Sequence, residues 1–141
     1  MKKIFISSDH AGYKLKEYIK LYLSKKKLIY KDLGPFNGNK VDYPDFAHKV
    51  ANKVKVSKNH MGILVCGSGM GMSIAANRHK KIRAAQCFNL KSTKLSRLHN
   101  DANIITLGSR VLSKNNALKF ISVFLNTKFE GGRHLKRVKK I

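Results

Sequence analysis

The chain has 141 residues, enough for one domain that buries its own core without help from a metal or disulfides. Hydrophobic residues make up 43% of it, which fits a globular fold, yet no apolar run approaches the roughly eighteen residues of a membrane helix. Thirty basic and 7 acidic residues give a formal charge of +23, which taken alone suggests a polyanionic partner.

The distribution of this charge weakens that suggestion. Lysines outnumber arginines 24 to 6 and are spread over the whole chain, and the densest cluster, Lys25–Lys27, is only three residues long. Proteins that bind nucleic acid more often concentrate arginines and aromatic residues on one face. The pattern favours a solvated cationic surface, with a basic nucleic-acid-binding protein as the alternative.

Neither end of the chain nor its cysteines indicate secretion. The first residues, Met1–Ile6, pass directly into β-prone sequence without a signal-peptide pattern, so we expect a cytoplasmic protein with no membrane segment. The two cysteines, Cys66 and Cys87, do not form a disulfide framework and are expected to be free thiols, although the sequence leaves a bridge between them open.

The predicted elements alternate between strands and helices. Residues 3–8 form a β-prone run, and residues 13–23 carry apolar side chains at helical spacing. The further predictions, in chain order, are a strand over 27–33, a helix over 45–56, a strand over 61–65, a helix over 70–77, a strand over 82–87, a helix over 90–99, a strand over 104–107, a helix over 115–125 and a basic tail over 129–141.

This alternation predicts right-handed βαβ crossovers. The expected fold is therefore a single-domain α/β protein with three layers, Rossmann-like, around a five-stranded parallel sheet. Ligands of such sheets bind beyond the carboxyl ends of the strands. That rule collects three segments at one edge: Asp9 with His10, the loop Cys66–Gly71, and Gly108–Arg110.

The most informative stretch is the apolar run from Gly62 that continues into Cys66-Gly-Ser-Gly-Met-Gly71. Glycines at every second position let the backbone turn tightly and point several N–H groups inward, which makes a cradle for an anion. A thiol at the rim of such a cradle, close to a helix N-terminus, gains thiolate character. The stretch therefore offers both a base and an anion hole.

Other interpretations of this loop are weaker. A dinucleotide site needs G-x-G-x-x-G spacing and an acidic residue at the end of the next strand, but that strand ends in Cys87-Phe-Asn89. A purely structural role for Cys66 is hard to reconcile with three neighbouring glycines and Ser68. A nucleophilic pair of Cys66 with His99 stays open, although no hydrolase signature accompanies it.

Polar residues elsewhere have local as well as functional explanations. Asp9 could cap the helix that follows and His10 could be a surface imidazole, or both could contact a polyhydroxy substrate or its phosphate. The cluster around His99 and Asn100 is explained locally by a helix end followed by turn residues.

The basic tail suggests an anion clamp. Arg133 and Arg137 are four residues apart, hence on one face if the tail is helical, and could bind phosphate together. The six histidines show no paired spacing with other metal-ligating residues, so the sequence predicts no metal site.

Several ordered motifs give the chain a resemblance to a known family. Over essentially all 141 residues it resembles the ribose-5-phosphate isomerase B family, which is related to galactose-6-phosphate and allose-6-phosphate isomerases. The motifs are Ser8-Asp-His-Ala-Gly12, Val41-Asp-Tyr-Pro44, Gly62-Ile-Leu-Val-Cys-Gly-Ser-Gly-Met-Gly71, Ser73-Ile-Ala-Ala-Asn77, Leu95-Ser-Arg-Leu-His-Asn-Asp101, Leu107-Gly-Ser-Arg110 and Glu130-Gly-Gly-Arg133.

The resemblance implies an aldose–ketose isomerase of the pentose phosphate pathway, in its non-oxidative branch. It would interconvert ribose 5-phosphate and ribulose 5-phosphate through a cis-enediolate, without a metal or organic cofactor. Carried over by position, Cys66 would take the proton from C2 and return it at C1. Ser68 would assist proton movement between O1 and O2, and His99 would open the furanose ring. The expected substrate contacts are Asp9, His10, Gly67, Ser68, Gly69, Met70, Gly71, Asn100, Arg110, Arg133 and Arg137, with the loop N–H groups stabilising the enediolate.

The resemblance also implies an assembly and leaves the substrate partly open. The expected partner is a second copy in a homodimer with shared active sites, with a dimer of dimers also open, and the tail 129–141 packing on the partner subunit. No specific nucleic acid is expected. A six-carbon sugar phosphate, allose or galactose 6-phosphate, is the alternative substrate. Ser7 stands where relatives often carry Gly, which predicts slight crowding of the first loop, whereas Ser68 keeps the hydroxyl of the Thr in many relatives.

Overall fold

A computed structural model describes all 141 residues and is built around one five-stranded parallel sheet. The strand order is β2-β1-β3-β5-β4, so the predicted α/β fold class is confirmed. The strands are β1 (Lys3–Ser8), β2 (Tyr30–Asp32), β3 (His60–Cys66), β4 (Ala84–Gln86) and β5 (Ile104–Gly108).

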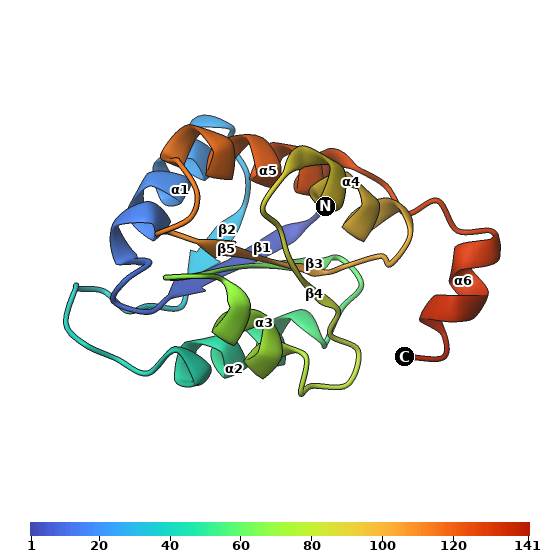
Figure 1. The fold of residues 1–141 in the computed structure, drawn as a ribbon, viewed down its shortest axis with the longest axis horizontal. Helices are drawn as coiled ribbons and strands as arrows, with labels where there is room; N and C mark the ends of the chain where they lie inside the picture. Colours follow the sequence, from blue (N-terminus) through green and yellow to red (C-terminus); the bar gives the residue numbers. More distant parts are fainter.

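Helices cover both faces of this sheet. Figure 1 shows α1, α4 and α5 on one face, α2 and α3 on the other, and α6 standing apart from both layers near the C-terminus. The helices are α1 (Tyr13–Lys25), α2 (Tyr43–Val54), α3 (Met70–Ala76), α4 (Leu90–Leu98), α5 (Lys114–Asn126) and α6 (Arg133–Val138). None of them combines the length and the apolar character needed to cross a lipid bilayer.

The central strand β3 shows why the sheet is double-sided. All its residues from Met61 to Cys66 are buried, because a parallel sheet covered on both faces needs apolar side chains pointing both ways. Ile63 and Val65 join the core beneath α1 and α5, whereas Leu64 and Cys66 join the core beneath α2 and α3. Cys87 belongs to the first of these cores, and both thiols are free.

The carboxyl end of β2 is tied to α1 by a buried charge. The side chain of Lys16 is fully buried, and its Nζ lies 2.7 Å from Asp32 Oδ2 and donates to Pro35 O at 2.8 Å. Burial alone would raise the pKa of Asp32, but hydrogen bonds from Lys16, Lys20 and the Gly34 N–H lower it below the ordinary value of 3.8. The ionised carboxylate therefore stabilises the packing of α1 on this edge.

The first loop accommodates Ser7 without crowding. Ser7 is fully buried, and its hydroxyl donates to Gly34 O at 2.5 Å. This bond connects the end of β1 to the turn after β2, so the additional hydroxyl has a partner rather than a clash.

Candidate active site

The segments predicted to meet at the carboxyl edge do meet there. Cys66 pairs with Gly108 in the sheet register, and beyond the strands Ser109 N–H donates to Cys66 O and Arg110 N–H to Gly67 O, at 2.8 and 3.0 Å. The loop after β3 and the loop after β5 are therefore held side by side. In Figure 1 this edge lies on the left, opposite α6.

The loop after β3 wraps around the Cys66 thiol. The residue is only 4% exposed, and its Sγ accepts a hydrogen bond from the Gly69 N–H at 3.1 Å. Gly69 has a φ of +81°, a conformation that favours glycine, and this is what turns its N–H back toward the sulfur. The loop therefore fixes the position of the sulfur atom relative to the cavity.

Several N–H groups of the same loop are unused. Those of Gly67, Ser68 and Gly71 have no hydrogen-bond partner within the chain. The Met70 N–H donates to Ser68 Oγ at 3.2 Å, and Gln86 Nε2 donates to Ser68 O at 2.9 Å, which fixes the loop from outside. Free and pre-oriented N–H groups beside a thiol are suited to stabilising an oxyanion.

These groups line a cavity of about 390 Å³. A Cβ added to Gly67 would lie 3.1 Å from Arg110 Nη1, so the guanidinium lies directly over the loop. A Cβ added to Gly71 would lie 2.7 Å from the Tyr43 ring, so the tyrosine forms the facing wall. The lining residues are Asp9, Tyr43, Cys66, Gly67, Ser68, Gly71, Arg110 and Val111.

Asp9 has the local role considered from the sequence, and its contact with a substrate stays a prediction. It is 7% exposed and lines the cavity, and its Oδ1 accepts from the Gly12 N–H at 2.9 Å in the turn before α1. His10 is half-buried, and its Nδ1 lies 3.2 Å from Val41 O and 3.3 Å from Val41 N. This contact orients the ring while Nε2 remains without a partner in the chain, so it is free to meet a ligand.

The other predicted site residues lie at the opposite edge. His99 and Asn100 follow α4, just before β5 begins, and β5 runs away from them toward the cavity. Five strand residues at about 3.3 Å each separate the two edges by roughly 16 Å. Arg133 and Arg137 are on α6, which confirms that the tail is helical there, and α6 stands beyond this same edge (Figure 1).

The tail and the end of α4 contact each other closely. The His99 and His134 rings stack with centroids 4.2 Å apart, and Nε2 of each lies 3.8 Å from Glu130 Oε2. The Glu130 N–H also donates to Leu98 O at 3.1 Å. Lost solvation and the adjacent His99 lower the pKa of His134.

Three residues at these two edges were missed from the sequence. Tyr43 belongs to the motif Val41-Asp-Tyr-Pro44, and its place in that motif could have indicated that it lines the cavity. Glu130 and His134 are four residues apart, but α6 begins only at Arg133, so helical spacing does not explain their contact. Their meeting with His99, some thirty residues earlier, depends on the fold and has no local signal.

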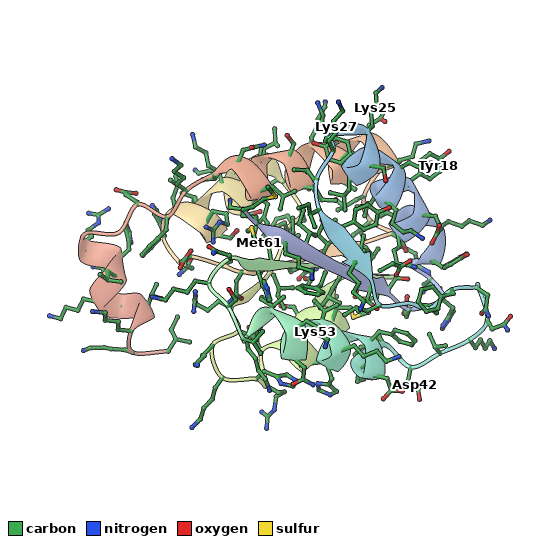
Figure 2. The ribbon with its side chains drawn as sticks, turned by 180° about the vertical axis from the view of Figure 1, so that it is seen from behind. Tyr18, Lys25, Lys27, Asp42, Lys53 and Met61 are labelled. Atoms are coloured by element: carbon green, nitrogen blue, oxygen red, sulfur yellow. The ribbon has the colours of Figure 1, made fainter.

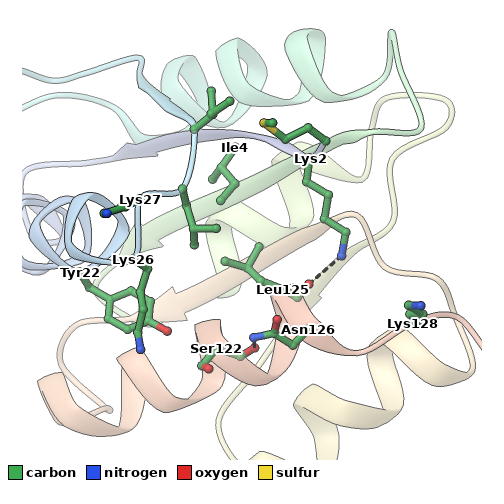
Figure 3. A pocket seen from close by; sticks show the side chains of 12 residues that line it. Lys2, Ile4, Tyr22, Lys26, Lys27, Ser122, Leu125, Asn126 and Lys128 are labelled. Carbon is green, nitrogen blue, oxygen red and sulfur yellow. Dashed lines mark hydrogen bonds between the residues drawn. The ribbon is translucent and has the colours of Figure 1, made fainter.

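Two other hollows lie at the amino edge, and neither has a thiol or a loop of free N–H groups. The first, about 510 Å³, lies between α1 and α5; Figure 3 shows Lys2 donating to Leu125 O, at 2.6 Å, with Lys26, Lys27 and Lys128 nearby. The second, about 530 Å³, is bounded by α6 and several cations. The cavity at Cys66 is the one that combines a thiol with unpaired loop N–H groups.

The surface charge is dispersed over the fold. Figure 2 shows long side chains projecting from most elements, with Lys25 and Lys27 near the end of α1 and Lys53 on α2, on the other face of the sheet. This dispersion agrees with a solvated cationic surface.

Comparison with known proteins identifies the family. Residues 4–141 match the model of the family described as Ribose/Galactose Isomerase. The chain belongs to this family. Escherichia coli ribose-5-phosphate isomerase B is 41% identical over 141 residues, covering 100% of this chain and 95% of that protein.

Solved structures agree with the assignment. The Clostridium thermocellum ribose-5-phosphate isomerase B structure has a TM-score of 0.95 and 48% identity, covering 98% of this chain and 93% of that one. The Mycoplasma genitalium enzyme, solved with bound ribulose 5-phosphate, has a TM-score of 0.95 and 43% identity over 98% of this chain and 92% of its own. The three-layer fold of this family is therefore also the fold of this chain.

Proposed function

We propose that this protein is an aldose–ketose isomerase that interconverts ribose 5-phosphate and ribulose 5-phosphate. The observation that carries the proposal is the Cys66 thiol, which accepts the Gly69 N–H and faces a cavity that also presents unpaired loop N–H groups and Arg110. Relatives named ribose-5-phosphate isomerase B, one of them solved with ribulose 5-phosphate, match nearly the full length.

The proposed chemistry uses each group for one task. The Cys66 thiolate removes the C2 proton of the open-chain aldose and returns it at C1. The oxygen that becomes negatively charged is stabilised by the loop N–H groups, one such donor being worth about 3–4 kcal/mol. Ser68 assists proton movement between O1 and O2, while Asp9 and His10 orient the sugar. Every step is a proton transfer, so the reaction needs no added oxidant or cofactor.

The remaining roles require a second copy of the chain. His99, as the acid that opens the furanose ring, and Asn100, Arg133 and Arg137, as sugar and phosphate contacts, are too far from Cys66 in the same chain. We propose a homodimer in which each cavity receives these residues from the partner, with the tail 129–141 packing on it. In this proposal the whole chain, 1–141, is one sugar-phosphate isomerase domain.

Exposed apolar side chains support this arrangement. They lie on α3 and in the segment after β4. These parts of the chain are adjacent, because Ser73 of α3 and Asn77, which follows it, both donate to Ala84 O. The exposed residues are Met70, Ile74, Phe88 and Leu90, at 54%, 70%, 61% and 49%. An unpaired apolar area beside the cavity is typical of a surface that contacts another subunit.

The expected setting is the cytoplasm and the non-oxidative branch of the pentose phosphate pathway, as for a metabolic sugar-phosphate isomerase.

The substrate is tested by comparing turnover of ribose 5-phosphate with turnover of allose 6-phosphate and galactose 6-phosphate. Preference for ribose 5-phosphate is expected. Faster turnover of a six-carbon substrate would reassign the substrate within the same family.

Mixing two impaired variants tests the shared site. Cys66→Ala homodimers should lose proton transfer, and His99→Asn homodimers should be limited by spontaneous ring opening. Random exchange of subunits makes half of the dimers heterodimers, each with one intact site. Activity should recover to about a quarter of the wild-type value. No recovery despite demonstrated exchange of subunits would rule out the shared site while leaving the isomerase assignment to the substrate assay.

A further inference from the structure

The cluster formed by His99, Glu130 and His134 has the composition of a metal site. One ligand atom from each of the three side chains lies within 4.8 Å of the others, and both imidazole Nε2 atoms lie 3.8 Å from the same carboxylate oxygen, Glu130 Oε2. Two histidines and one carboxylate are the protein ligands of several zinc sites, in which the fourth position stays open. We propose that this cluster binds a divalent transition-metal ion, with Zn²⁺ as the representative, and that the bound ion inhibits the enzyme.

Binding requires the acidic side chain to close and one imidazole ring to rotate. Ligand atoms at 2.0–2.2 Å from a tetrahedral zinc lie about 3.3 Å apart, so each histidine must approach Glu130 by roughly 0.5 Å. His134 is only 5% exposed and is held by its stack on His99, whereas the carboxylate of Glu130 is half exposed and can move. Movement of the acidic side chain must be accompanied by rotation of the partly exposed His99 ring out of the stack, because the lone pairs of two nearly parallel rings, at 11°, cannot point at one ion.

The charge around the cluster explains why such a site would be weak and selective. Arg133 Nε donates to His134 Nε2 at 3.4 Å, and Arg137 is on the same short helix. A metal must displace the Arg133 contact, which the exposed guanidinium permits by rotating into solvent. Hard cations such as Mg²⁺ prefer oxygen ligands and would gain little from two imidazoles, whereas Zn²⁺ and its neighbours prefer them.

Binding would have a consequence for catalysis. Nε2 of His99 cannot donate a proton while it coordinates a metal, so opening of the furanose ring would stop. The binding does not depend on the proposed function, whereas the inhibition rests on the ring-opening role of His99. The two parts are therefore tested separately.

The first experiment is a binding titration with Zn²⁺ and with Co²⁺ on the purified full chain. We expect one ion per chain and a cobalt spectrum of nitrogen and oxygen ligands, without a thiolate charge-transfer band. Glu130→Gln and His134→Ala should weaken binding at least about tenfold, since even outer-sphere changes cost that much. Arg133→Gln should tighten it, because a competing donor and a positive charge are both lost.

The matched control is His48→Ala. His48 and His79 form the other histidine pair of the chain, with Nδ1 of one 2.8 Å from Nε2 of the other, and this variant should bind zinc like the wild type. Circular dichroism in chelator verifies that each variant is folded. Absence of binding, a thiolate band, or loss of binding in His48→Ala instead of the cluster variants would overturn the assignment.

The second experiment adds zinc to the isomerase assay. Turnover of ribose 5-phosphate by wild-type enzyme should fall as the site fills and recover with chelator. If zinc occupies the cluster, as the titration reports, and turnover is unchanged, the inhibition is disproved while the binding site stands. If the apo enzyme does not isomerise ribose 5-phosphate at all, the proposed function fails and the binding result is unaffected.

Discussion

Replacing Cys66 by alanine removes the proposed base from the cavity. The other ionisable residues of the lining are poorly suited to substitute, because Asp9 already accepts the Gly12 N–H, Tyr43 is only a weakly acidic phenol and Arg110 is a cation. Proton transfer by a positioned side chain contributes about 10²- to 10⁴-fold, equivalent to roughly 3–5 kcal/mol of transition-state stabilisation. We expect kcat to fall by that factor, with KM changed little because the phosphate contacts remain.

The effect on folding should be smaller than the effect on rate. Only a sulfur atom is lost, and the Gly69 N–H loses its acceptor beside an open cavity that water can enter, so the cost is about 1–2 kcal/mol. The rate is measured by formation of the ketose, and loss of the C2 hydrogen to D₂O, followed by NMR, isolates the proton transfer from binding.

Cys87→Ala is the matched control. Cys87 is 1% exposed in the opposite core, where burial raises the pKa of its thiol, and no role in the cavity is available to it. This variant should lose similar stability yet keep turnover within about threefold, as expected for a change distant from the reacting atoms. The reasoning is refuted if Cys66→Ala retains turnover within tenfold of the wild type, or if Cys87→Ala loses as much turnover as Cys66→Ala.

Three further changes test other parts of the argument. His99→Asn should leave the enzyme dependent on spontaneous ring opening, so that the rate stops rising with enzyme concentration; a rate that stays proportional to enzyme contradicts the assigned role. Asp32→Asn leaves the buried Lys16 charge poorly paired, so it should lower the free energy of unfolding, measured by urea titration, by about 3–5 kcal/mol. Lys16→Met removes the buried charge itself and should lower that free energy by less than half as much. Because folding lowers the pKa of Asp32, its contribution to the free energy of unfolding is complete above pH 3.8 and is lost as the pH falls further. Asp32→Asn should therefore make the free energy of unfolding fall less steeply below that pH, and an unchanged fall contradicts the pairing. Gly69→Ala puts a Cβ on a residue with a φ of +81°, 3.0 Å from the Leu107 carbonyl carbon, and should lower the free energy of unfolding by about 1–3 kcal/mol. It should also lower kcat, because the N–H moves away from Cys66. An unchanged kcat would contradict the proposed role of the loop.

The sequence predicted the element order well because the hydrophobic periods are clear, but it overextended the edge strands. The strand expected over 27–33 is only Tyr30–Asp32, since Leu28 and Ile29 are 38% and 50% exposed beyond the sheet. The strand expected over 82–87 is only Ala84–Gln86. Ile82 is buried, but its backbone N–H donates to His79 O in a turn. Apolar residues at an edge can pack without joining a ladder, and periodicity does not separate the two cases.

The helix before the third strand also begins earlier than predicted. The expected range was 45–56, whereas α2 is Tyr43–Val54 and starts with Pro44 in its first turn. Proline is favoured at that position because its missing N–H has no helical partner there. The shift matters for the site, because it presents Tyr43 at the start of the helix, toward Gly71 and the cavity.

The position of Asp9, Cys66 and Arg110 at one end of the sheet was predictable from sequence, whereas the position of His99 relative to them was not. The reason is the geometry of parallel sheets. The rule that ligands bind at the carboxyl ends of strands collects Asp9, Cys66 and Arg110, because each lies at or just beyond the carboxyl end of a strand. His99 precedes a strand, so the same rule places it at the far edge, and only a second copy of the chain could return it to a cavity.

That second copy would deliver its residues as one unit. The Glu130 N–H bonds to Leu98 O, and the His134 ring stacks on His99, so the tail is fixed to the end of α4. The imidazole proposed to open the ring and the arginines of α6 therefore share one rigid attachment. In the proposed dimer, any change that detaches the tail should impair ring opening and phosphate binding together. His134→Ala removes the stack on His99, so it is expected to raise KM and to make ring opening limiting in the same protein, and a variant that shows one effect without the other would disprove the coupling.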